Sequence, residues 1–89
     1  MATVKLFGTL RKTVEPGSSL QLPGKDVQAV LVALCEHYPL VAETLYENGD
    51  IRPYFRITLN GIDIGMSKGL DTPVSDGDRI SIFSPIAGG

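Results

Sequence analysis

One segment, from Val27 to Tyr38, restricts the possible folds of this 89-residue chain more than any other. Its apolar residues recur at the spacing of one helix face: Val27, Val30, Leu31, Leu34, Cys35 and Tyr38. Asp26 is a favourable N-cap, and Pro39 ends the helix, because the residue before a proline is pushed out of the helical region. A helix of about three turns with one apolar face has to pack that face against a second layer.

The residues before this helix alternate as strands do. Thr3–Leu10 carries apolar and polar residues in turn, with Gly8 interrupting the apolar face. The residues Glu15–Ser19 have turn chemistry, with a proline and a glycine at their centre. Because Leu20 and Leu22 alternate again, the sequence predicts an opening hairpin.

A second hairpin is predicted after the helix. Residues 54–59 alternate between apolar and polar side chains. The following pair, Asn60-Gly61, is the strongest short hairpin signal, because both residues accept the positive φ of a type I′ turn. Ile62 and Ile64 are therefore expected on the returning strand.

The remaining elements complete an α+β domain. A short helix or turn is expected over Val41–Tyr46, ending at Asn48-Gly49. Ser75–Asp78 predicts a tight turn into a last strand, Arg79–Phe83, which Pro85 ends because proline cannot donate to a strand ladder. The predicted fold is a mixed sheet of four to five strands with one main helix packed on one face.

Composition excludes several classes of protein. A net charge of −2 without a basic block argues against nucleic acid as a partner. No apolar run approaches the roughly 20 residues needed to cross a bilayer, and the N-terminus does not resemble a secretory signal. The one cysteine, Cys35, cannot form an internal disulfide. We therefore expect residues 1–89 to form a single cytoplasmic domain with no membrane partner.

Few residues offer chemistry of their own. His37 has no second histidine or cysteine at a metal-ligand spacing, so no metal site is predicted. Cys35 lies on the apolar helix face, where a free cysteine behaves as a small hydrophobe. Asp76 and Asp78 are too few ligands for an EF-hand loop, and a turn is the better interpretation. The chain is therefore poorly equipped to catalyse a reaction alone.

The chain ends on Gly88-Gly89 after an apolar strand. Glycine loses more conformational freedom on folding than any other residue and anchors a terminus poorly. The ending fits either an unstructured terminus or a tail that works in an extended form inside a partner. We expect residues 84–89 to form a flexible tail.

Four segments carry a resemblance to a known family. They are VKLFGTLR, IRPYFRITLNG, GLDTPVSDGDRISIF and the ending SPIAGG. Together they resemble the MoaD/ThiS family of ubiquitin-like sulfur carriers, which includes the small subunit of molybdopterin synthase. The resemblance spans nearly the whole chain and implies a ubiquitin-like β-grasp fold, with the first and last strands side by side and parallel.

The resemblance also implies a function for the tail. The C-terminal carboxylate of Gly89 would be adenylated and converted to a thiocarboxylate, while Gly88, Ala87, Ile86 and Pro85 thread through a partner's tunnel. No cofactor would be bound to this chain, because the partner uses the ATP. The implied partners are a MoeB/ThiF-like adenylyltransferase of the ubiquitin-activating type, a persulfide-bearing sulfurtransferase and a MoaE-like large subunit of molybdopterin synthase.

A binding surface follows from strand alternation. Because successive side chains of a strand point to opposite faces, Phe7 and Phe83 are expected on the face that does not pack against the helix. Arg56 and Arg79 are expected on the same side. Aromatic residues and arginines are enriched at binding hot spots, so these four residues are the predicted partner-binding surface.

Several alternatives stay open. Molybdopterin-synthase small subunits often carry two prolines and a valine before the final Ala-Gly-Gly, whereas this chain has Ser84, Pro85 and Ile86. Its length exceeds that of the usual thiazole carriers and favours the molybdopterin branch. Other possibilities are a carrier for thiazole synthesis, tRNA thiolation or cysteine biosynthesis, a protein modifier that forms an isopeptide bond through Gly89, and a binding module without tail chemistry.

Overall fold

A computed structural model describes residues 1–14 and 20–83, and its elements follow the predicted order. The elements before the second hairpin are β1 (Ala2–Leu6), η1 (Gly8–Thr13), β2 (Leu20–Leu22), α1 (Val27–His37), α2 (Pro39–Leu45), β3 (Tyr46–Glu47) and β4 (Asp50–Ile51). The later elements are β5 (Arg56–Leu59), β6 (Ile62–Asp63), η2 (Ile64–Met66), η3 (Gly69–Asp71) and β7 (Arg79–Phe83). The η elements are 3₁₀ helices.

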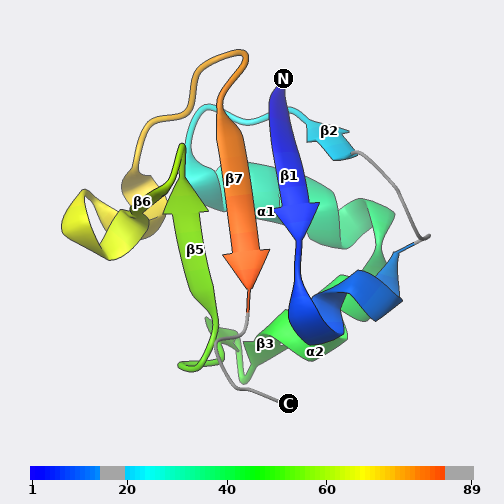
Figure 1. Ribbon diagram of the computed structural model, residues 1–89. Helices are drawn as coiled ribbons and strands as arrows, with labels where there is room; N and C mark the ends of the chain where they lie inside the picture. The colour runs from blue at the N-terminus through cyan, green and yellow to red at the C-terminus, as the bar shows by residue number, and fades with distance from the viewer. Residues whose placement is uncertain (15–19, 84–89) are drawn as a thin grey trace.

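The main sheet has five strands in the order β2-β1-β7-β5-β6. The two strands from opposite ends of the chain, β1 and β7, run parallel in its centre, and Figure 1 shows them side by side. Their register pairs Thr3 with Arg79 and Leu6 with Ile82. All other pairings in this sheet are antiparallel. This is the mixed sheet with parallel terminal strands that the β-grasp resemblance implies.

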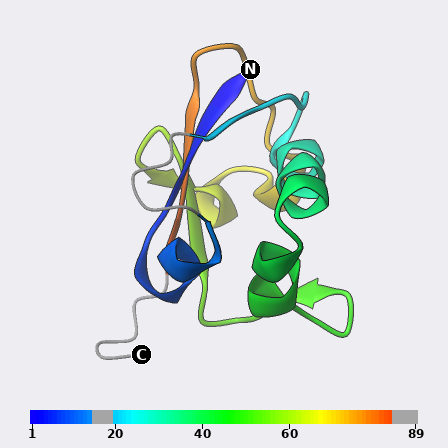
Figure 2. The same cartoon turned by 90° about the vertical axis from the view of Figure 1, so that its right-hand side faces the viewer.

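The helix α1 forms where the apolar periodicity predicts it. The carboxylate of Asp26 accepts a hydrogen bond of 2.8 Å from the backbone N–H of Ala29 and caps the N-terminus. Tyr38 leaves the helical conformation, and Pro39 begins α2. Figure 2 shows both helices on the same side of the main sheet.

The core lies between these helices and the sheet. Strand residues Val4, Ile80 and Ile82 and the α1 residues Leu31 and Leu34 are at most 1% exposed. Alternation leaves the neighbouring strand residues on the other face of the sheet, away from α1 and α2 (Figure 2). The sheet therefore has one buried face and one open face.

Two strand predictions were too long. The predicted strand over Thr3–Leu10 ends at Leu6, because Gly8 has a φ of 67° and begins the 3₁₀ helix η1. This helix turns Leu10 fully into the core. Strand β5 begins at Arg56, although the buried Phe55 before it keeps the predicted apolar face.

The structure also corrects the segments around the second hairpin. Ile64 does not continue the returning strand but begins η2, where the carboxylate of Asp63 accepts a hydrogen bond of 2.7 Å from Gly65 N–H. The hairpin formed by β3 and β4 was not predicted, and its turn is Asn48-Gly49. The predicted short helix starts at Pro39 rather than Val41.

The remaining turn and strand predictions are confirmed where the structure describes them. Asn60 and Gly61 have φ values of 52° and 87°, as a type I′ turn requires. The final strand, β7, has the predicted bounds Arg79–Phe83. The predicted turn at 15–19 and the predicted flexible tail at 84–89 lie outside the described residues.

Candidate functional site

The strand that leads to the C-terminal segment lies in the middle of the sheet. β7 pairs with β1 on one side and with β5 on the other, and Ile80 and Ile82 are fully buried. Its last residue, Phe83, directly precedes Ser84. Any segment that follows therefore starts from a rigid, central position rather than from a sheet edge. The predicted tail residues Pro85, Ile86, Ala87, Gly88 and Gly89 lie outside the described residues.

Three of the four predicted surface residues meet at this end of β7. The backbone N–H of Phe7 donates a hydrogen bond of 3.0 Å to the carbonyl of Ile82. Arg56 is the register partner of Phe83 in the antiparallel β5–β7 ladder. Phe7 continues the extended backbone beyond Leu6 and is 43% exposed, while the side chain of Arg56 is 61% exposed. The Phe7 ring and the Arg56 guanidinium thus lie beside Phe83, the last described residue.

Arg79 lies on the same face but at the other end. It begins β7 and pairs with Thr3, four residues before Phe83. At about 3.3 Å per residue, the two positions are roughly 13 Å apart along the strand. The structure therefore separates Arg79 from the other three residues.

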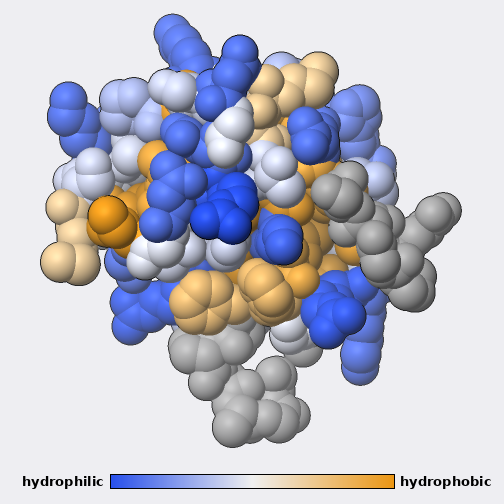
Figure 3. Space-filling model, turned by 45° about the horizontal axis from the view of Figure 1, so that its top comes forward, coloured by the Kyte–Doolittle hydropathy of each residue, from blue (hydrophilic) through white to orange (hydrophobic). Residues whose placement is uncertain are grey.

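Lys5 was missed as a member of this surface. It lies on β1 between Thr3 and Phe7, it is exposed, and its register partner is Ser81. The same alternation that selected Phe7 would have identified it. We call Lys5, Phe7, Arg56, Arg79 and Phe83 the open-face surface. Figure 3, which looks partly onto this side, shows strongly hydrophilic and hydrophobic side chains next to one another.

The open-face surface combines positive charge with aromatic rings. Its only anion pairing near the end of β7 among the described residues is weak, since Arg56 Nη1 lies 3.8 Å from a carboxylate oxygen of Asp63. At the Arg79 end, Asn60 Oδ1 accepts a hydrogen bond of 2.9 Å from the Arg79 backbone N–H. The side chains of Arg56 and Arg79 can therefore bind an acidic surface of a partner.

The turn before β7 is fixed by carboxylates. Asp78 accepts hydrogen bonds of 2.8 Å from Ser75 N–H and 3.1 Å from the Asn60 side chain, and these bonds lower its pKa. The N-terminal ammonium of Met1 donates to Asp76 and lowers the pKa of that carboxylate. These contacts hold the turn and the start of β1 together, away from the end of β7.

The described part of the chain offers no metal site. It contains no group of three or more histidine, cysteine or carboxylate side chains that could bind a metal. His37 is exposed at the end of α1, and burial raises the pKa of the Cys35 thiol, which therefore stays protonated at neutral pH. Within residues 1–14 and 20–83, no helix is long and apolar enough to span a membrane. The open-face surface can bind a partner while β7 presents the segment that follows it.

A family comparison covers both the open-face surface and the terminal glycines. A family model described as the ThiS family matches residues 4–89. The chain belongs to the ThiS family. This match confirms the family indicated by the four sequence segments, and it extends through Gly89.

Two relatives of this ThiS-family chain match over nearly their whole lengths. Small archaeal modifier protein 3 of Haloferax volcanii is 33% identical over 88 residues, which cover 97% of this chain and 96% of the relative. Sulfur carrier protein CysO of Mycobacterium tuberculosis is 30% identical over 90 residues, which cover 98% of this chain and 97% of the relative. The chain thus belongs to a family of ubiquitin-like proteins that includes named sulfur carriers and modifiers.

A solved structure agrees with this assignment. The small archaeal modifier protein 1 from Methanosarcina acetivorans aligns with a TM-score of 0.85 and 34% identity. The alignment covers 99% of this ThiS-family chain and 95% of the other. It confirms the ubiquitin-like β-grasp fold.

Proposed function

We propose that this chain is a sulfur carrier whose C-terminal Gly89 carboxylate is activated and converted to a thiocarboxylate. The observation that carries the proposal is the family match, which runs through the terminal Gly88-Gly89. The relative named a sulfur carrier protein supports the same chemistry. A carboxylate with a pKa near 3.5 is anionic at neutral pH and resists nucleophilic attack, so it needs activation.

The activation has two balanced steps. The carboxylate attacks the α-phosphate of ATP, which forms an acyl-adenylate and releases pyrophosphate. A hydrosulfide equivalent from a sulfur donor then adds to the acyl carbon and displaces AMP, which leaves a thiocarboxylate. The partner that binds ATP is an adenylyltransferase of the MoeB/ThiF type. The hydrosulfide comes from a persulfide-bearing sulfurtransferase, when a second thiol attacks the inner sulfur of the persulfide, forms a disulfide with it and releases the outer sulfur as hydrosulfide.

The structure suggests how the chain serves these partners. The central strand β7 holds Phe83 rigidly, so the segment after it starts from a fixed point. Phe7, Arg56 and Phe83 surround that point on the open face of the sheet. A partner that binds these residues gains a fixed distance between its docking surface and the tail that enters its active site.

A second candidate function is protein modification. It is favoured by the similarity to a relative named a small archaeal modifier protein. In this function, a lysine amine of a target attacks the carbonyl carbon of the Gly89 acyl-adenylate, displaces AMP and forms an isopeptide bond. A role as the small subunit of molybdopterin synthase, with a MoaE-like large subunit as the sulfur acceptor, stays a prediction. Roles in thiazole synthesis, tRNA thiolation and cysteine biosynthesis also stay predictions.

Adenylation can be tested by ATP–pyrophosphate exchange. Purified chain is incubated with a MoeB/ThiF-type enzyme, ATP and labelled pyrophosphate, and a variant lacking Gly88 and Gly89 is the matched control. Exchange that depends on the full-length chain supports the proposal, and equal exchange with both chains contradicts it. Trypsin cuts after Arg79, the last basic residue of the chain. Remnants of residues 80–89 on target lysines, detected by mass spectrometry after trypsin digestion, would favour the modifier function.

A further inference from the structure

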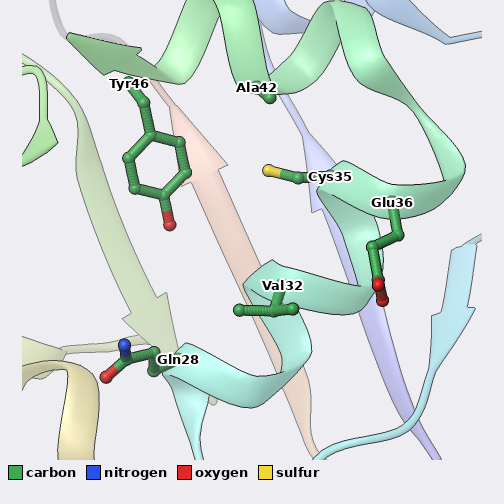
Figure 4. Close-up of a pocket in the computed structure, with 6 residues that line it drawn as sticks. All are labelled: Gln28, Val32, Cys35, Glu36, Ala42 and Tyr46. Carbon is green, nitrogen blue, oxygen red and sulfur yellow. The ribbon is translucent and has the colours of Figure 1, made fainter. Parts of the chain in front are cut away.

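A groove lies on the helical side of the molecule, on the other side of α1 from the sheet. Figure 4 shows its lining, which comes from α1, α2 and the start of β3. The lining residues are Gln28, Val32, Cys35, Glu36, Ala42 and Tyr46. Its volume is about 470 Å³, within the range of roughly 300–1,000 Å³ that is typical of ligand-binding sites.

The walls of this groove are apolar where a surface helix is usually polar. Val32 follows the fully buried Leu31 on α1 but is 49% exposed. Burial raises the pKa of both Cys35 and Tyr46, and the neighbouring Cys35 raises that of Tyr46 further. Both groups are therefore uncharged at neutral pH. A single exposed valine needs no explanation, but a concave cluster of Val32, Cys35, Ala42 and Tyr46 is typical of a binding surface.

The segment that forms the groove is acidic. Between Val27 and Ile51, the chain contains four acidic residues and no lysine or arginine. The acidic residues are Glu36, Glu43, Glu47 and Asp50, and all four are exposed. Because the whole chain has a net charge of −2, the residues outside this segment carry a net +2. Among the described residues, Arg52 lies beside two of these acidic residues: its guanidinium is 3.6 Å from a carboxylate oxygen of Glu47 and donates a hydrogen bond of 3.4 Å to the Glu43 carbonyl.

We infer that this groove is a second docking surface, for a basic amphipathic helix of a partner protein. The apolar face of such a helix would fill the cavity next to Val32 and Tyr46, and its lysines or arginines would lie near Glu36 and the other carboxylates. An acidic helix would be repelled by the same residues.

The position of the groove makes this surface independent of the open-face surface. Both helices lie on one side of the sheet (Figure 2). Lys5, Phe7 and Arg56 are exposed and alternate with buried strand residues, so their side chains lie on the other side. A partner on the helical side therefore leaves the end of β7 accessible. The chain can in this way bind one protein while a second protein acts on its tail.

The test is an NMR titration of the full ¹⁵N-labelled chain with two synthetic helical peptides. One peptide has leucines on one face and lysines on the other, and its partner carries glutamate in place of every lysine. The lysine peptide is expected to bind saturably and to shift the amide signals of Gln28, Val32 and Tyr46. The glutamate peptide is expected to produce no saturable shift.

Two variants locate the binding. Val32→Lys places a cation in the groove and should weaken the lysine peptide at least about tenfold. Met66→Lys adds the same charge at a residue that is 83% exposed in η2 and should change the affinity less than about twofold. Equal weakening by the two variants, equal binding of the two peptides, shifts centred on the open-face surface, or no saturable binding would each overturn the inference.

Discussion

Arg56 lies directly opposite Phe83 in the antiparallel ladder between β5 and β7, and strand alternation places both side chains on the face of the sheet away from α1 and α2. The neighbouring Phe7 is tied to the same end of β7 by its backbone hydrogen bond to Ile82. The three residues therefore surround the point from which the C-terminal segment departs. This arrangement links the fold to the proposed docking of an activating enzyme.

Charge reversal at Arg56 should weaken docking without unfolding the chain. Because its side chain is 61% exposed, Arg56→Glu should change the melting temperature by less than about 4 °C. Loss of an arginine hot spot should weaken binding of the activating enzyme by about tenfold or more, measured by calorimetry. Met66→Glu, at another exposed position, is the control. A large fall in melting temperature for Arg56→Glu would show a structural role instead.

Phe7→Asp should have the same effect on binding. The ring is 43% exposed, and the hydrogen bond to Ile82 uses the backbone, so the substitution keeps the contact between β1 and β7. The expected result is at least about tenfold weaker binding at a melting temperature within about 4 °C of the parent. A much larger destabilisation would mean that the ring belongs to the core.

Substitution at Gly88 should separate stability from activation. In a narrow tunnel of the activating enzyme, a valine side chain would clash and misplace the Gly89 carboxylate. A displacement of about 1 Å can lower the rate of adenylation on the order of 100-fold. Gly88→Val should therefore melt like the parent but support ATP–pyrophosphate exchange far more slowly. Equal exchange by both proteins would mean that the terminal glycines are not threaded.

The cap of α1 should contribute measurably to folding. Asp26→Ala removes the acceptor for Ala29 N–H and should cost about 1 kcal/mol, or about 4–8 °C in melting temperature for a domain of this size. Asp26→Asn, which keeps an acceptor, should lose much less. Equal losses for the two variants would contradict the capping role.

The helix and the last strand could be predicted because their signals are local. Six apolar positions at helical spacing, with Asp26 before and Pro39 after, identify α1 without knowledge of its neighbours. The turn Asn60-Gly61 and the strand Arg79–Phe83 likewise follow from turn chemistry and alternation.

Other features depend on contacts between distant residues. Nothing local in Gly8–Thr13 indicates a 3₁₀ helix, since its alternation continues that of β1 while Leu10 turns into the core. The two-residue strands β3 and β4 are too short to show a period. The parallel pairing of β1 with β7 was implied only by the family resemblance.

The candidate site was predictable only in part for the same reason. Parity places Phe7, Arg56, Arg79 and Phe83 on one face, because side chains alternate along each strand. The register between strands decides which of them meet, and it places Arg56 beside Phe83 but Arg79 beside Thr3. Register is set by the whole sheet, so a single strand does not reveal it.

Intact-mass and tandem mass spectrometry of the chain test the central claim most directly. The chain is incubated with its activating enzyme, ATP and hydrosulfide, and the omission of ATP is the control. The account predicts the ATP-dependent replacement of one oxygen by sulfur, located on Gly89. An unchanged mass, or a sulfur added at Cys35, would contradict it.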